Sequence, residues 1–406
     1  MPSPLFAPPR LRLPADGGER HTTWLETFYD LVFAVAVAAL GVRLGADLSA
    51  VGVLRFLALF IPLWWTWLGH TVYDTRFDTD DVPQRLLTFG IMLAAAAMAV
   101  TIPRAFEGAS AGFAAAYVAA RACLLLLYGR AYRHAVEARP FVLYYLASFG
   151  CGAALWAMSI LTPPQVRYAL WTIGMAVELA TPWLVRPTLR RAPVDTSHLP
   201  ERLALFTVIV LGELITAVVG SVGSVSTGRI AAAALVAAML AFVLAACVWW
   251  VYFTFVEVSA FAERLGSGQP YIYLHLPLVA GLTLSGVGLS SAITLATRPA
   301  LPAATRLVLG GGVLLWLAAA LGLKLVSLGH GLEPAVYARY AGFAACVATL
   351  SLLGGLLPPL AMLGGLVLVM LVFAVLDVRH WTAWSHAHPR PTADTQAAES
   401  NHRGPS

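Results

Sequence analysis

Long runs of apolar residues dominate this chain and restrict it to a fold that forms in a lipid bilayer. Only 12% of the residues are charged, whereas a soluble domain carries roughly 25%. The runs are about twenty residues long, the length of a membrane-spanning helix, and the alternating pattern of a β-barrel is missing. The sequence therefore predicts an all-α, polytopic integral membrane protein of about twelve transmembrane helices. The predicted spans lie near 27–45, 52–72, 85–102, 110–129, 141–161, 166–186, 202–222, 230–254, 271–295, 305–326, 336–356 and 358–376.

The distribution of arginines predicts the orientation of these spans. The two tails and alternate loops together hold more arginines than the opposite loops, and the cytoplasmic side normally carries this excess. We therefore expect both termini to lie in the cytoplasm, with the chain in the cytoplasmic (inner) membrane. The net charge of +5 is explained by these loops, so the expected partner is the lipid bilayer and not nucleic acid. Lys324 is expected to reach the cytoplasmic surface from the tenth span by snorkelling.

Two stretches of the chain resemble two copies of one design. Each begins with an apolar helix that carries carboxylates and continues into a helix with a tryptophan pair, Trp64–Trp65 or Trp249–Trp250. Apolar helices align readily with one another, but tryptophan pairs in register favour a true repeat. Six spans separate the copies, so the two halves would share one orientation, as in some secondary transporters. The predicted units are a cytoplasmic tail at 1–22, six-helix repeats at 23–190 and 191–377, and a disordered cytoplasmic tail at 378–406.

Several motifs occur in an order that resembles a known family. They are WLETFYDLVF, RFDTDD, HLPERLALFTVIVLGE, WWVYF and YLHLPL, and together they resemble the bacterial low temperature requirement A family. The resemblance implies an integral membrane protein named for a role in growth in the cold, and it implies no reaction, substrate or catalytic residue. Thr254 stands where the family's tryptophan motif usually has an aspartate. Glu257 lies nearly one turn further on and could substitute for it.

Ionisable side chains inside apolar spans are costly, so they are the candidates for function. Glu26 and Asp30 are four residues apart and share one face of the first helix. Glu26 suits a helix N-terminus, whereas Asp30 is expected to point into the bundle toward a partner. Glu213 is placed about 18 Å along a helix that starts near Glu201, close to the middle of the membrane.

Glu178 and Arg121 are expected at the same depth as Glu213, and Arg121 is expected to pair with Glu213 or Glu178. One arginine against two carboxylates leaves one acid unpaired, and an unpaired acid in a medium of low dielectric holds a proton. A proton-coupled carrier needs such a group, although a hydrogen-bonded acid in a passive core would behave alike. His275 could bind a proton or a cation, but a hydrogen-bonded interfacial histidine is the favoured interpretation.

These residues lead to three hypotheses of function. The first is a proton-coupled permease for an unknown small solute, with Asp30, Glu213 and Glu178 around a cavity between the halves and Arg121 as their counter-charge. The alternative is a non-transporting structural or cold-stress adaptation factor, in which the charges only hold helices together. An enzyme acting on lipid ranks lowest, because His198 with Glu201 and His275 are its only candidates. No nucleotide-binding or hydrolase motif and no CxxC spacing is present, so no catalytic residue, cofactor or metal is expected.

Overall fold

The computed structural model describes residues 5–12, 22–185, 198–224, 229–258, 268–328 and 332–387. These ranges contain twelve long α-helices, which confirms the all-α prediction. The helices are α1 (Trp24–Gly45), α2 (Ala50–Arg76), α3 (Val82–Thr101), α4 (Ser110–His134), α5 (Arg139–Ile160), α6 (Pro164–Leu184), α8 (His198–Gly223), α9 (Arg229–Val258), α10 (Gln269–Thr294), α11 (Ala303–Leu328), α12 (Pro334–Leu353) and α13 (Pro359–Ala387). The short elements are η2 (Ile102–Arg104), η3 (Val136–Ala138), η4 (Gly354–Leu356), β1 (Arg10–Leu11) and β2 (Phe77–Asp78).

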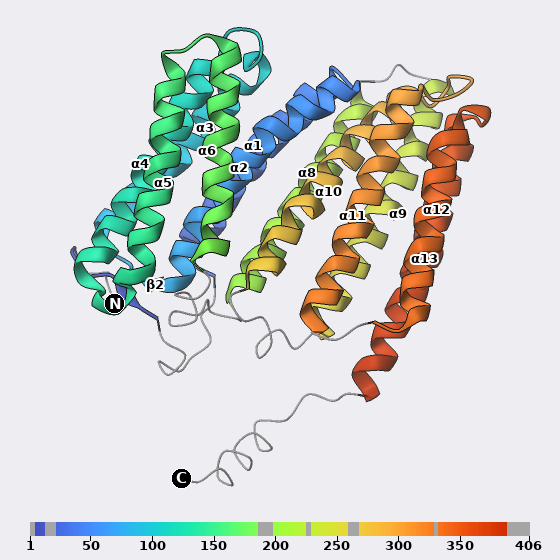
Figure 1. Ribbon diagram of the computed structural model, residues 1–406. Helices are drawn as coiled ribbons and strands as arrows, with labels where there is room; N and C mark the ends of the chain where they lie inside the picture. Colours follow the sequence, from blue (N-terminus) through green and yellow to red (C-terminus); the bar gives the residue numbers. More distant parts are fainter. Residues whose placement is uncertain are drawn as a thin grey trace.

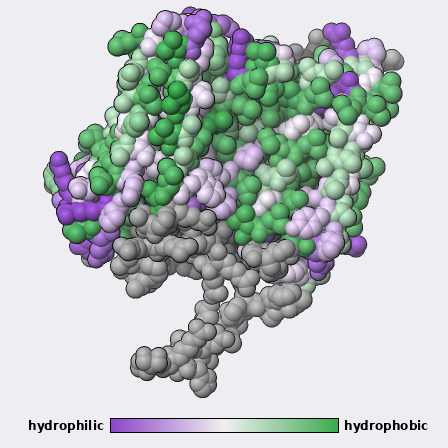
Figure 2. All heavy atoms as spheres, viewed as in Figure 1, coloured by the Kyte–Doolittle hydropathy of each residue, from purple (hydrophilic) through white to green (hydrophobic). Residues whose placement is uncertain are grey.

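The described helices have the length and composition of a multi-span membrane protein. Eleven of them are long and apolar enough to cross a membrane. The twelfth, α6, is more polar because it includes Gln165, Arg167 and Glu178. Figure 2 shows hydrophobic residues over most of the middle of the face in view, with hydrophilic residues gathered near the ends of the helices. A surface of this kind is suited to contact with lipid tails.

Residues at the helix ends explain where the helices begin. Thr23 accepts a hydrogen bond from the Glu26 N–H, and the Glu26 carboxylate accepts one from the Thr23 N–H, which is a capping box at the start of α1. Asp81 caps α3 by accepting a hydrogen bond from the Gln84 N–H at 3.0 Å. The predicted end of the last helix is wrong, because α13 continues past Asp377 to Ala387. The remainder of the expected C-terminal tail lies outside the described residues.

The helices form two groups that lie side by side, α1–α6 and α8–α13 (Figure 1). In both groups the first helix packs on the second and third, the third on the fourth, the fourth on the fifth, and the fifth on the sixth. The correspondence is not complete, because α13 packs closely on α9 whereas the described residues of α6 make no comparable contact with α2. A second difference is that Trp64 and Trp65 are buried, whereas Trp249 and Trp250 are exposed. The two six-helix repeats therefore stay a prediction. We call the side of the bundle on which α1 begins and α13 ends, lower in Figure 1, the tail side.

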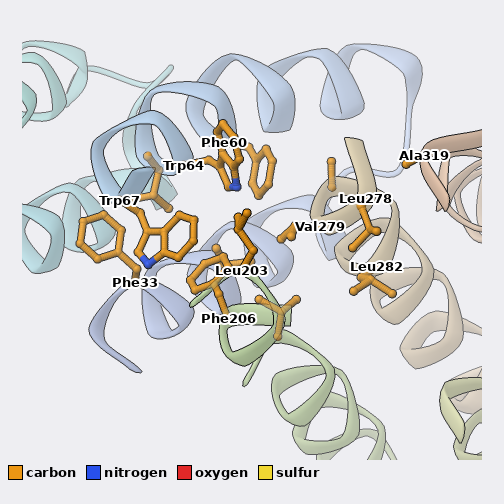
Figure 3. Close-up of a cluster of buried hydrophobic side chains, with 14 of the residues drawn as sticks. Phe33, Phe60, Trp64, Trp67, Leu203, Phe206, Leu278, Val279, Leu282 and Ala319 are labelled. Carbon is orange, nitrogen blue, oxygen red and sulfur yellow. The ribbon is translucent and has the colours of Figure 1, made fainter. Parts of the chain in front are cut away.

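The two halves meet along a seam where α1 and α2 contact α8 and α10. A cluster of apolar side chains fills the seam, with Phe33, Trp67, Leu203, Phe206 and Leu282 among its members (Figure 3). The rings of Trp67 and Phe206 stack with their centroids 4.2 Å apart. This packing joins the first half to the second through closely packed apolar side chains.

Candidate functional site

A groove lies between the two halves on the side opposite the tail side. It has a volume of about 530 Å³ and is lined by residues of α1, α8 and α10. The lining runs from the middle of each helix to its C-terminal end: Val37 to Gly45 on α1, Val210 to Ser224 on α8, and Leu282 to Thr294 on α10. The volume falls within the range of about 300–1,000 Å³ that small-molecule sites occupy.

Glu213 is the ionisable side chain of this groove. It lies 15 residues after His198, the first residue of α8, which corresponds to about 22 Å of helix. Of the α8 residues in the groove only Val210 comes earlier in the helix, so Glu213 lies near the inner end of the groove. Within the described part of the chain Glu213 has no hydrogen-bond or ion-pair partner. Its carboxylate is therefore free to bind a proton or a solute.

Hydroxyl groups supply most of the other polar atoms of the groove. Thr216 and Ser221 donate their protons to carbonyl groups one turn earlier in α8, and Thr283 does the same in α10. A hydroxyl that donates in this way keeps its oxygen lone pairs as acceptors. Ser290 Oγ is buried and has no hydrogen-bond partner within the described ranges. The groove therefore presents acceptors and a carboxylate, which match a cation or a molecule rich in hydrogen-bond donors.

Asp30 and Glu26 lie outside the groove, in what we call the tail-side network: Glu26, Asp30, Trp67, His198 and Arg202. Arg202 of α8 donates to Asp30 Oδ1 at 2.7 Å, and its second terminal nitrogen lies 3.4 Å from Glu26 Oε2. Trp67 Nε1 also donates to Asp30 Oδ1, at 2.8 Å. His198 Nε2 lies 3.4 Å from Glu26 Oε2. The network bridges the halves near the tail side with charges that are almost fully buried.

Arg121 pairs with Glu178 and not with Glu213. Arg121 of α4 and Glu178 of α6 are fully buried, and a terminal guanidinium nitrogen lies 2.8 Å from Glu178 Oε2. Tyr117 accepts a hydrogen bond from Arg121 Nε at 2.9 Å and donates one to Glu178 Oε2 at 2.8 Å. Gly152 makes room for this carboxylate, because an added Cβ would lie 2.4 Å from Glu178 Oε1. These contacts hold α4, α5 and α6 together within the first half.

The structure thus separates the residues that we expected around one cavity. Glu213 lines the groove, whereas Asp30, Glu178 and Arg121 are engaged in buried ion pairs elsewhere. His275 is also outside the groove: its Nδ1 lies 2.9 Å from the Tyr271 carbonyl oxygen and its Nε2 lies 2.9 Å from Tyr252 Oη. With both ring nitrogens engaged and the ring fully buried, His275 is a hydrogen-bonded core residue.

The sequence analysis missed the buried ion pair of the second half. Lys324 of α11 donates to Asp377 of α13, and both side chains are almost fully buried. The ammonium nitrogen lies 4.9 to 5.4 Å from the ring centroids of Phe255, Tyr340 and Trp381, distances that allow cation–π attraction. The expectation that Lys324 snorkels to the surface is therefore wrong. Thr254 is half-buried on α9, and the side chain of Glu257 lies outside the described residues.

Twelve long helices, an apolar outer surface and charged side chains paired inside the bundle define a multi-span helical membrane protein. Residues 21–375 match the family described as bacterial low temperature requirement A protein (LtrA). The chain belongs to this family, as its motifs predicted. It is also 30% identical over 302 residues to the uncharacterized protein RA0937 of Rhizobium meliloti (strain 1021), in an alignment that covers 66% of this chain and 72% of the relative.

Proposed function

We propose that this protein is a proton-coupled permease, whose groove takes up a small solute that is cationic or rich in hydrogen-bond donors. The observation that supports this proposal is Glu213, a carboxylate near the inner end of a groove between the halves with no partner among the described residues. An acid without a counter-charge at membrane depth favours its protonated form. A bound cation favours the ionised form, so solute and proton would compete for Glu213. Because only one of them can occupy the carboxylate at a time, a bound solute can be exchanged for a proton.

The closure of the seam supports a groove that is accessible from one side at a time. Between the groove and the tail side lie the apolar cluster of Figure 3 and the tail-side network. Leu282 belongs to both the cluster and the groove lining, so the cluster lies directly against the groove. A rocking movement of one half against the other would close the groove and open the tail side, as in carriers built from parallel repeats. The ion pair between Arg202 and Asp30 would then be the contact that has to rearrange.

We propose that the membrane is the bacterial cytoplasmic membrane and that the tail side faces the cytoplasm. The excess of arginines in the tails and alternate loops supports this orientation. The test is labelling of single cysteines introduced at exposed loop positions, in intact cells, with a membrane-impermeant maleimide. We expect Glu107→Cys, between α3 and α4, to react and Glu137→Cys, between α4 and α5, to be protected until the cells are lysed. The opposite pattern would reverse the orientation.

Proteoliposomes test the transport proposal directly. An internal pH-sensitive dye reports proton flux when an outward gradient of a candidate cationic solute is applied. We expect Glu213→Gln to reduce the solute-driven proton flux at least about tenfold, because the amide cannot exchange a proton. Glu201→Gln is the matched control, since Glu201 lies in the first turn of the same helix, where it accepts a hydrogen bond from Thr22. Equal flux in the wild type and Glu213→Gln would refute the proposal.

The alternative function is a structural or cold-stress adaptation factor without transport. The buried pairs Arg121–Glu178 and Lys324–Asp377 favour it, because each ties together helices that are separate in the sequence. This alternative predicts that cells with Glu213→Gln grow normally in the cold whenever the variant accumulates to the wild-type level. The permease proposal predicts the opposite if growth in the cold depends on the transported solute.

A further inference from the structure

A second, smaller cavity lies at the seam, toward the tail side. It has a volume of about 30 Å³ and is lined by α2, α4, α5, α6 and α10, so it touches both halves. A site needs about 10–15 Å³ to hold one water, so this cavity has room for one or two water-sized particles. Its polar lining consists of Arg76, Tyr128, Tyr145, Gln269 and Tyr273, and no carboxylate of the described residues is part of that lining.

Arg76 is a buried cation without a counter-charge among the residues that the structure describes. Only 2% of its surface is exposed, and within the described ranges no carboxylate lies within 4.0 Å of its guanidinium group. Its polar contact is Tyr145 Oη, 3.5 Å from Nη1, and its Nε has no hydrogen-bond partner. The rings of Phe141 and Tyr145 lie 5.5 and 5.9 Å from the guanidinium carbon. Cation–π contacts offset only part of the cost of burying an unpaired guanidinium group.

Other polar side chains of the lining also carry an atom without a hydrogen-bond partner among the described residues. Tyr128 Oη is buried and has no hydrogen-bond partner in the described part of the chain, so its O–H is available as a donor. The Gln269 amide nitrogen donates to the Pro182 carbonyl, and its Oε1 is an acceptor without a partner. A water molecule alone could satisfy these groups, but it would leave the positive charge of Arg76 uncompensated.

We propose that this cavity binds an inorganic anion of halide size, such as chloride. Arg76 supplies the positive charge, and the hydroxyl groups of Tyr128 and Tyr145 donate hydrogen bonds to the anion. A water beside it donates to Gln269 Oε1. The size of the cavity excludes larger organic anions. Because Arg76 lies on α2, Tyr128 on α4, Tyr145 on α5 and Gln269 on α10, the bound anion ties the two halves together on the tail side. The site is separate from the groove, and it stands whether or not the groove transports a solute.

Thermal unfolding of the full-length protein in detergent micelles tests this site. Sodium chloride is titrated against sodium gluconate at constant ionic strength, so that only the identity of the anion changes. We expect the melting temperature of the wild type to rise with chloride and to saturate, because a ligand that binds only the folded state stabilises it. The same melting temperature in chloride and in gluconate would overturn the proposal.

Variants assign the response to the cavity. Arg76→Gln is expected to abolish the chloride-dependent rise, and a variant that folds and keeps the rise would refute the assignment. Arg85→Gln is the matched control, because it also removes one positive charge on the tail side. Arg85 lies in an exposed ion pair with Asp80 and not in the cavity. It should respond like the wild type. If Arg76→Gln fails to fold, Tyr145→Phe is used, and we expect its half-saturating chloride concentration to rise about tenfold through loss of a hydrogen bond to a charged group. An unchanged half-saturating concentration would then refute the site.

Discussion

Glu178 and Glu213 are both glutamates in long apolar helices, yet their surroundings differ completely. Glu178 is fully buried, and its Oε2 forms an ion pair with Arg121 and accepts a hydrogen bond from Tyr117. Glu213 faces a groove between the halves and has no partner among the described residues. The difference teaches that a place within an apolar helix does not decide whether an acid is paired. A paired carboxylate is committed to holding helices together, whereas an unpaired carboxylate can still bind a proton or a solute.

The second half of the molecule repeats the structural solution of the first. Arg121 and Glu178 lie on the fourth and sixth helices of the first half, and Lys324 and Asp377 lie on the fourth and sixth helices of the second. Each half therefore contains a buried cation–carboxylate pair between its fourth and sixth helices. Glu213 lies on α8, the first helix of the second half, and takes part in neither pair. This contrast separates two sets of predictions, which concern stability and transport respectively.

The largest effect is expected from breaking the fully buried ion pair of the first half. Glu178→Gln leaves Arg121 charged and fully buried without a carboxylate, which typically costs about 3–5 kcal/mol of folding free energy. The double variant Arg121→Leu/Glu178→Leu removes both charges and should recover most of that loss. Unfolding in mixed detergent micelles measures both. A loss below about 1 kcal/mol in Glu178→Gln would show that the pair does not stabilise the first half.

A smaller loss of folding free energy is expected from breaking the ion pair of the second half. Lys324→Gln leaves Asp377 without its cation, and losing a hydrogen bond to a charged group costs about 1.5–3 kcal/mol. The effect should be smaller than that of Glu178→Gln because Lys324 lies within the last turn or two of α11, where water is closer. The same unfolding measurement compares the two variants. A larger loss for Lys324→Gln would reverse the order that we infer from depth.

Two glycines of α5 sharpen the comparison without changing any charge. Gly152→Ala places a Cβ 2.4 Å from Glu178 Oε1, so the carboxylate must move, and overpacking of this kind costs about 1–3 kcal/mol. Gly150→Ala is the matched control on the same helix, because nothing lies within 4 Å of its added Cβ. It should be neutral or stabilising by up to about 1 kcal/mol, as alanine favours helix. Equal effects of the two changes would mean that Gly152 is not required for the position of Glu178.

The sequence predicted the helices well because long apolar runs have few alternative structures in a membrane. It also limited the partner of Arg121 to Glu213 or Glu178, because helical rise places side chains at a definite depth. It could not predict which partner, since depth says nothing about which faces of two helices meet. Glu178 and Glu213 therefore remained alternatives until the packing of α4 against α5 and α6 was known.

Cations near helix ends were the main source of error. Arg202, Arg76 and Lys324 lie close to predicted loops, where basic residues usually set the topology. The structure buries all three. Arg202 is held by Asp30 from the other half, and Lys324 by Asp377 of α13. Contacts between helices far apart in sequence decide this burial, so no local pattern indicates it.

The smallest effect on stability is expected at Glu213, and it completes the comparison with Glu178. Glu213→Gln breaks no hydrogen bond or ion pair found in the described residues, so its free energy of unfolding should stay within about 0.5 kcal/mol of the wild type. The same variant should lose solute-driven proton flux, whereas Glu178→Gln should lose stability first. Unfolding and flux, measured on one preparation of each variant, show whether Glu178 affects stability and Glu213 affects proton flux. A loss of stability in Glu213→Gln as large as that in Glu178→Gln would mean that both acids hold helices together, and the groove would then lack a free ionisable group.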